Sequence, residues 1–162
     1  MPYPHCPTES TESHTGKGYP VRAAIVDDDK HDRLATELLL KRLGGFECVA
    51  MYGAAQDALR GVPAINPGLV LMDIRMAGMD GIEGTRRLKD ALPHVKVVMT
   101  TGLLDSGSMD QAIEAGACGY LIKPLQPVQC LATLKTTLAI CSVPGMSDPA
   151  GRRTMLKIRS RH

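Results

Sequence analysis

Acidic side chains follow two apolar runs of this sequence at the point where each run ends. Asp27, Asp28 and Asp29 come directly after the run 21–26, and Asp73 comes directly after a second such run. Carboxylates crowded into one place repel one another and take up protons unless a cation lies among them. A hard ion such as Mg²⁺ meets that need, because it takes oxygen ligands and commonly uses one or two carboxylates with phosphate oxygens and water. A carboxylate can also attack phosphorus and form an acyl phosphate.

A hydroxyl and an ammonium group end two further apolar runs. Thr100 and Thr101 close one run, and Lys123, followed by Pro124, closes the other. We favour Thr101 over Thr100 as the functional hydroxyl because Gly102 follows it directly. A metal ion, an ammonium group and a hydroxyl donor can together spread the charge on the equatorial oxygens of a transferring phosphoryl group. The acids, the hydroxyl and the lysine are therefore sufficient for an aspartate to accept a phosphoryl group, without a further base.

The elements that would position these residues alternate between strand and helix. Continuous apolar runs are typical of a parallel sheet that is covered on both faces, and runs with helical spacing stop here at glycine or proline. We predict strands at 21–26, 46–51, 69–72, 95–100 and 119–122. We predict helices at 31–43, 54–62, 82–92, 108–115 and 127–140. Five βα units with right-handed crossovers form a doubly wound α/β sandwich, whose ligands bind beyond the carboxyl ends of the strands.

Two segments flank this pattern, which we expect to form one domain over residues 21–141. Residues 1–20 are rich in Pro, Ser, Thr and Gly, and we predict that they are disordered. Residues 142–162 begin with Pro and Gly breakers and end in a basic tail at 152–161. The net charge of +2 is too small to argue for nucleic acid. Because the tail is too short for a helix-turn-helix, we do not expect it to bind DNA.

The cysteines and the N-terminus indicate a cytoplasmic protein. The five cysteines form no C-x-x-C pair, and we interpret them as free thiols in a reducing compartment. They are Cys6, Cys48, Cys118, Cys130 and Cys141. The N-terminus lacks a secretory signal, and no apolar run approaches the roughly 18 residues of a membrane span. We therefore expect no membrane partner.

Four motifs in order resemble the receiver domain of bacterial response regulators in two-component signal transduction. They read AAIVDDD, LVLMDIRMAGMDG, VVMTTG and GYLIKP, and the similarity covers about residues 21–141. The resemblance implies a flavodoxin-like (βα)5 fold with strand order 2-1-3-4-5. It also implies a phosphoacceptor that receives a phosphoryl group from a histidine kinase or a histidine phosphotransfer protein. Such a domain is no enzyme beyond the phosphorylation and dephosphorylation of its own aspartate.

The resemblance assigns a role to each acid at the strand ends. Asp73 is similar to the phosphorylated aspartate, and Asp28 to the direct ligand of Mg²⁺ or Mn²⁺. Asp27 is similar to the acidic neighbour that often acts on the metal through water. The backbone carbonyl of Arg75 falls where the family supplies another metal ligand. Asp29 directly precedes the first helix, and we interpret it as the N-cap of that helix.

The resemblance also identifies a switch. Thr101 is similar to the hydroxyl that turns toward the phosphoryl group, Lys123 to the lysine that pairs with that group, and Tyr120 to the aromatic residue whose rotamer follows the switch. The Lys123-Pro124 bond is cis in the family. Ala77 departs from the Pro usual in the family, which we expect to loosen its loop without affecting the chemistry.

Two further positions tune the access of water to the acyl phosphate in the family. They are occupied here by Arg75 and Leu103, each two residues beyond a site residue. A bulky cation and an apolar side chain would hinder an attacking water. Our hypothesis is therefore a phosphoryl-aspartate that hydrolyses slowly.

Several functions remain open at the level of sequence. With no output domain visible, we expect a regulator that binds a target directly, relays phosphate or drains it from a kinase. Whether phosphorylation leads to a homodimer is left open by the sequence. A receiver-like interaction module that works without phosphorylation is an alternative, as is a transcriptional regulator with a lost or separate output domain. A hydrolase with an aspartyl-phosphate intermediate is disfavoured, because Arg75 occupies the place of its second acid.

Overall fold

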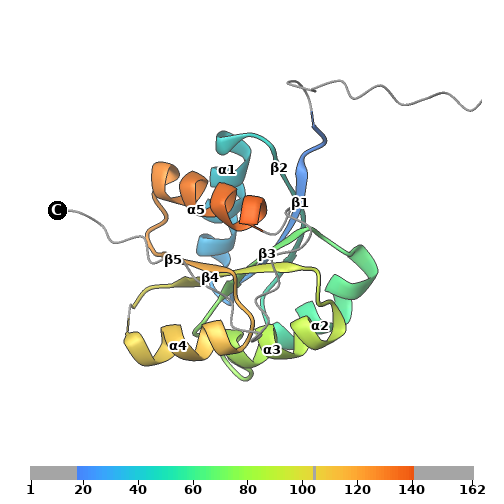
Figure 1. Cartoon of the computed structure of the whole chain (residues 1–162), viewed down its shortest axis with the longest axis vertical. Coiled ribbons are helices and arrows are strands. Elements are labelled where there is room, and N and C mark those ends of the chain that lie inside the picture. The colour runs from blue at the N-terminus through green and yellow to red at the C-terminus, as the bar shows by residue number, and fades with distance from the viewer. Residues whose placement is uncertain (1–17, 104, 141–162) are drawn as a thin grey trace, which may run out of the picture.

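Five apolar segments form one parallel sheet, and the helices that connect them cover both of its faces (Figure 1). The computed structural model describes residues 18–103 and 105–140. The strands are β1 (Val21–Val26), β2 (Phe46–Tyr52), β3 (Leu69–Asp73), β4 (Lys96–Thr101) and β5 (Gly119–Ile122). The helices are α1 (Lys30–Leu43), α2 (Ala55–Ile65), α3 (Gly81–Ala91), α4 (Ser106–Glu114) and α5 (Pro127–Ile140). The predicted α/β class is confirmed. The predicted disordered segment 1–20, apart from 18–20, and the basic tail 142–162 lie outside the described residues.

The order of the strands places the start of the chain in the middle of the sheet. All neighbours pair in parallel, in the order β2-β1-β3-β4-β5, which confirms the predicted order. From β1 the chain continues to its neighbour β2 and then crosses back to β3, which lies on the other side of β1. The direction of winding therefore reverses between β1 and β3, and such a switch point is where open α/β sheets bind ligands.

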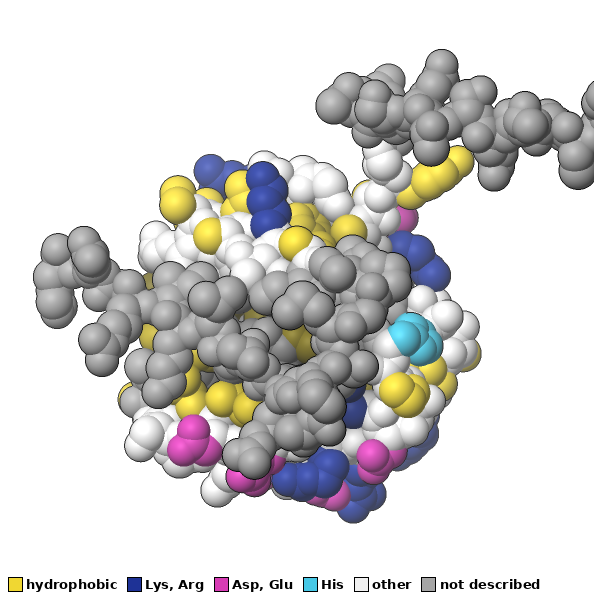
Figure 2. All heavy atoms as spheres, in the orientation of Figure 1, with side chains coloured by type: hydrophobic (Ala, Val, Ile, Leu, Met, Phe, Trp, Pro, Cys, Tyr) yellow, Lys and Arg dark blue, Asp and Glu magenta, His cyan; other side chains and the backbone are white. Residues whose placement is uncertain are grey.

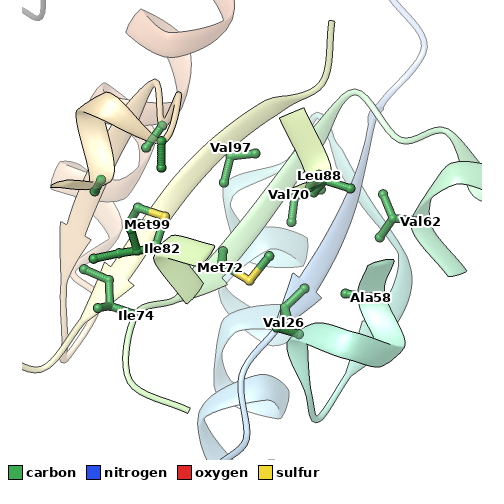
Figure 3. Close-up of a cluster of buried hydrophobic side chains, with 14 of the residues drawn as sticks. Val26, Ala58, Val62, Val70, Met72, Ile74, Ile82, Leu88, Val97 and Met99 are labelled. Atoms are coloured by element: carbon green, nitrogen blue, oxygen red, sulfur yellow. The ribbon is translucent and has the colours of Figure 1, made fainter. Parts of the chain in front are cut away.

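Each face of the sheet has its own apolar core. On one face, Val70 and Met72 of β3 pack with residues of α2 and α3 such as Val62 and Leu88 (Figure 3). On the other face, Leu71 packs with residues from α1 and α5. Neighbouring residues serve opposite faces because side chains alternate along a strand. In Figure 1, α1 and α5 accordingly lie on one side of the sheet and α2, α3 and α4 on the other.

Aspartates cap three of the helices where these leave the carboxyl edge of the sheet. The carboxylate of Asp29 accepts hydrogen bonds from the amides of His31 (2.7 Å) and Asp32 (3.1 Å), which confirms the predicted N-cap of α1. Asp80 caps α3 in the same way. Asp105 caps α4 by accepting from the amide of Ser108 at 2.7 Å. This cap explains why α4 begins at residue 106, earlier than the predicted start at 108.

Helix α2 continues past the point where the sequence predicted its end. The prediction stopped at residue 62, but the helix includes Pro63 and ends at Ile65. A proline so close to the C-terminus removes one helical hydrogen bond only. Asn66, in the left-handed conformation (φ 48°), closes the helix with its amide bonded to the Val62 carbonyl at 2.8 Å.

The surface carries charges of both signs beside scattered apolar side chains. Glu83 of α3 pairs with Arg86 (2.6 Å) and Arg87 (2.7 Å), and charged side chains of both signs lie along the lower rim in Figure 2, where Figure 1 places α3. Such exposed pairs contribute little to stability. Among the residues that the structure describes, no helix has the length and apolar character needed to cross a membrane.

Candidate functional site

The switch point brings the acids of β1 and β3 to one level of the sheet. Val26 pairs with Met72, so the residues that follow them, Asp27 and Asp73, emerge side by side. Both are buried, with exposed fractions of 2% and 5%, whereas Asp28 is exposed. Carboxylate oxygens of Asp27, Asp28 and Asp73 all lie within 4.8 Å of one another. The sequence-predicted acids therefore form one cluster, which we call the acid cluster.

Hydrogen bonds fix Asp27 within this cluster. One carboxylate oxygen accepts from the Asp29 amide at 2.9 Å, and the other accepts from the Lys123 ammonium at 2.6 Å. Its backbone carbonyl accepts from the guanidinium of Arg33. Its amide donates to the carbonyl of Tyr52 at 3.0 Å, which ties the end of β1 to the end of β2.

Asp28 reaches from β1 to the loop that follows Asp73. Its carboxylate accepts a hydrogen bond from the Ala77 amide at 3.0 Å. A proline at position 77 has no N–H and could not donate this bond. Ala77 therefore supplies a direct contact to one member of the acid cluster that a proline could not make. The expectation that it leaves the chemistry unaffected stays a prediction.

The environment of Asp73 disfavours its ionised form. Burial raises the pKa of Asp73 to about 6, and the charges of Asp27 and Asp28 act in the same direction, against the neighbouring Lys123 ammonium at 3.2 Å. A cation bound among these carboxylates would favour the ionised form of Asp73. Three oxygen donors this close together suit a hard divalent ion such as Mg²⁺. The residues present thus fit the metal that the family implies.

Lys123 lies at the end of β5 and extends into the acid cluster. Its amide donates to the Thr101 carbonyl at 2.8 Å, which continues the pairing of β4 with β5. The Lys123-Pro124 peptide bond is cis, as the resemblance implies. Burial of the ammonium disfavours its charge, but its hydrogen bonds to Asp27 and Asp32 and the charge of Asp73 outweigh this effect and raise the pKa of Lys123.

Sequence reasoning missed Asp32 as a member of the site. Its carboxylate accepts a hydrogen bond from the Lys123 ammonium at 2.8 Å, although it belongs to α1 and not to a strand end. A signal was present in the sequence, because Asp32 lies in the first turn of a helix that starts at the carboxyl edge of the sheet.

Thr101 and Tyr120 lie on the neighbouring strands β4 and β5. The Thr101 hydroxyl donates to the Leu103 carbonyl at 2.7 Å and accepts from the Leu103 amide at 3.2 Å, so it bonds within its own loop. Thr101, Leu103 and Tyr120 line one side of a pocket whose other side includes Ala112 of α4. Thr100, the alternative hydroxyl, pairs with Asp73 along the strands and is buried.

Arg75 pairs with an acid outside the acid cluster. Its guanidinium forms an exposed ion pair with Asp105 at 3.8 Å, which joins the loop after β3 to the start of α4. Leu103 is 60% exposed. The role predicted for the Arg75 carbonyl as a metal ligand stays a prediction.

The fold and the site together define a doubly wound α/β domain with an acid–lysine site at its switch point. The chain matches the family described as the response regulator receiver domain over residues 23–135. It belongs to this family and is a receiver domain of the response regulators of two-component systems. Such a domain is a signalling module, and the aspartyl-phosphate hydrolase considered from the sequence is thereby set aside.

Curated relatives of this chain are regulators of transcription. It is 37% identical over 116 residues to the transcriptional activator protein ExaE of Pseudomonas putida. The matched region covers 71% of this chain and 54% of that protein. It is 36% identical over 105 residues to the transcriptional regulatory protein LnrK of Bacillus subtilis. The matched region covers 65% of this chain and 48% of that protein. The chain thus spans about half the length of the curated relatives that it matches.

Solved structures agree with the fold. A two-component response regulator of the LuxR family from Aurantimonas superposes with a TM-score of 0.70 at 30% identity, covering 74% of this chain and 86% of that one. A CheY-like response regulator receiver domain protein from Methanospirillum hungatei superposes with a TM-score of 0.69 at 28% identity. The superposition covers 75% of this chain and 96% of that one.

Proposed function

We propose that Asp73 accepts a phosphoryl group from a histidine kinase or a histidine phosphotransfer protein and that the domain then signals to a protein partner. The observation that carries the proposal is the contact of the buried Asp73 with Lys123 at 3.2 Å, inside a cluster that includes Asp27 and Asp28. A nucleophilic carboxylate, a place for a cation and a fixed ammonium group are the parts that phosphoryl transfer requires.

The transfer forms one bond and breaks another. A carboxylate oxygen of Asp73 attacks the phosphorus of a phosphohistidine, and the P–N bond breaks with its electron pair going to the imidazole nitrogen. Lys123 stabilises negative charge on the phosphoryl oxygens. Mg²⁺ or Mn²⁺, held by Asp27, Asp28, Asp73 and the Arg75 carbonyl, supplies Lewis-acid stabilisation of the same charge when bound.

The response to phosphorylation involves Thr101 and Tyr120. In the described state the Thr101 hydroxyl is bonded to the Leu103 carbonyl at 2.7 Å. A phosphoryl oxygen on Asp73 offers this hydroxyl a charged acceptor in place of a neutral one, and charge-assisted hydrogen bonds are the stronger kind. Thr101 turns to the phosphoryl group, Tyr120 moves into the pocket beside it, and the surface of α4 and α5 changes.

The signal then passes from this surface to another molecule. The altered face near α4 and α5 is presented to a protein target or to a second copy of the domain. This signalling takes place in the cytoplasm. The domain catalyses no reaction beyond the phosphorylation and dephosphorylation of Asp73. Control of transcription is a second candidate, favoured by curated relatives that bear such names and extend well beyond the region that this chain matches. The basic tail remains without a proposed role in DNA binding.

Phosphorylation by a small donor tests the central claim. The full chain is incubated with Mg²⁺ and acetyl phosphate, and the intact mass is measured with and without EDTA. We expect a mass increase of one phosphoryl group that requires Mg²⁺ and is absent from Asp73→Asn. A wild-type protein whose mass stays unchanged would support instead an interaction module that works without phosphorylation.

A further inference from the structure

The ammonium group of Lys123 contacts three carboxylates at once. Its Nζ atom lies 2.6 Å from Asp27, 2.8 Å from Asp32 and 3.2 Å from Asp73. An ammonium group has three N–H donors and no acceptor. Two of its donors bond to Asp27 and Asp32, and the ammonium group also faces Asp73. A phosphoryl oxygen on Asp73 therefore competes with Asp27 and Asp32 for Lys123.

Asp32 is the partner that is least costly to give up. Its side chain is 48% exposed, compared with 3% for Asp27 and 7% for Asp73. A released Asp32 carboxylate can be hydrated, whereas a released Asp27 would be left as a buried charge without its cation. Asp73 itself carries the phosphoryl group, so Lys123 must stay near it. The exchange falls on Asp32.

The backbone holds Asp32 where it can compete for Lys123. Its amide donates to the Asp29 carboxylate at 3.1 Å, which fixes the first turn of α1 beside the acid cluster. The Asp32 carboxylate is not part of that cluster, so its removal leaves the three candidate metal ligands in place.

We propose that Asp32 is a positioning residue that holds Lys123 in the unmodified domain and opposes its transfer to the phosphoryl group. This inference rests on the proposed function. Because Asp32 binds Lys123 in the unmodified state only, it shifts the equilibrium between the two states toward the unmodified one. Loss of the Asp32 carboxylate therefore favours the phosphorylated state through Lys123.

Beryllofluoride, which mimics a phosphoryl group on an aspartate, provides the measurement. Its affinity for the full chain with saturating Mg²⁺ is measured by amide NMR, since the chain has no Trp to report by fluorescence. We expect Asp32→Asn and Asp32→Ala to bind beryllofluoride roughly twofold to fivefold more tightly, the range that corresponds to one partly screened ion pair. Asp32→Glu, which keeps the charge, should return the affinity toward that of the wild type.

A matched control removes the same charge from another helix. Asp57 also lies in the first turn of its helix, is 59% exposed and pairs with a cation, Arg60, at 3.9 Å. Asp57→Asn should leave the beryllofluoride affinity unchanged. The Mg²⁺ affinity, measured separately by calorimetry, should change by less than the beryllofluoride affinity in Asp32→Asn, because no candidate ligand has been removed.

A double-mutant cycle asks whether the effect passes through Lys123. In a Lys123→Met background, Asp32→Asn should no longer increase the affinity. An unchanged or weaker affinity in both Asp32 variants, or an equal gain in the Lys123→Met background, would overturn the inference while the proposed function stands. A wild-type domain that does not respond to beryllofluoride through Asp73 would overturn both.

Discussion

The ammonium of Lys123 lies 2.6 Å from the carboxylate of Asp27, although 96 positions separate the two residues in the chain. The contact joins the end of β5 to the end of β1 across the carboxyl edge of the sheet. It leaves the site acidic on balance, because Lys123 is shared among three carboxylates while Asp28 lies beside them.

The neighbouring residues Asp28 and Asp29 should differ in their effect on metal binding. Asp28 belongs to the acid cluster, whereas Asp29 accepts hydrogen bonds from the first turn of α1. We expect Asp28→Asn to weaken Mg²⁺ binding by about tenfold or more, since a carboxylate ligand is lost. Asp29→Asn should leave Mg²⁺ binding unchanged. It should lower the melting temperature slightly or not at all, because Asn is also a good N-cap. Calorimetry with Mg²⁺ distinguishes the two variants, and equal losses of affinity would contradict the distinction.

The stability of the metal-free protein should depend on pH through Asp73. Burial raises the pKa of Asp73 to about 6, above the value of 3.8 for a free side chain, so the folded state holds this proton more tightly than the unfolded state. Ionised Asp73 therefore costs stability above its folded pKa, and the cost disappears as the pH falls toward the unfolded value.

Replacement of this carboxylate by an amide should accordingly stabilise the metal-free protein near neutral pH. In EDTA, Asp73→Asn is expected to raise the free energy of unfolding by about 1–2 kcal/mol at about pH 7.5, allowing for solvent screening, and by much less at about pH 4. Urea unfolding at both pH values measures the difference. Asp57→Asn serves as a control for the loss of an exposed carboxylate, and a gain for Asp73→Asn that is the same at both pH values would contradict the assignment.

Gly81 should be required for the close approach of α3 to β3. A Cβ atom at this position would lie 1.9 Å from the carbonyl oxygen of Asp73, and the Gly81 amide bonds to the Ile74 carbonyl at 2.9 Å. We expect Gly81→Ala to cost roughly 2 kcal/mol or more, because backbone has to move. Gly107→Ala in α4, whose nearest neighbour would be an ordinary contact at 3.5 Å, should be neutral or stabilising. Chemical denaturation compares the two variants.

Arg75 and Leu103 should slow the hydrolysis of phosphorylated Asp73. The two side chains belong to the loops after β3 and β4, and the Arg75 guanidinium is drawn toward Asp105 at 3.8 Å. Trimming both residues to Ala opens the route for water, and we expect the acyl phosphate to decay several times faster. The decay is followed by intact mass after removal of the phosphodonor. Equal lifetimes in the wild type and the double variant would show that these residues do not shield the site.

The sequence by itself determined the fold class and the principal site residues. Apolar runs that end in Asp27 and Asp73 predict buried parallel strands, and the carboxyl ends of such strands share one edge of the sheet. The sequence alone therefore predicts that these acids meet. Helix boundaries were less certain, because Pro63 is tolerated near a C-terminus and Asp105 starts α4 early.

Only the tertiary structure decided how the site residues share their hydrogen bonds. Asp32 takes part because the first turn of α1 lies beside the end of β5. The sequence places Asp32 in that turn, but only the packing of α1 brings the turn to Lys123. Ala77 holds Asp28 through a backbone amide, which residue types do not reveal. Periodicity reports which face of an element is buried, whereas individual contacts depend on how separate elements pack, and that packing is a property of the whole chain.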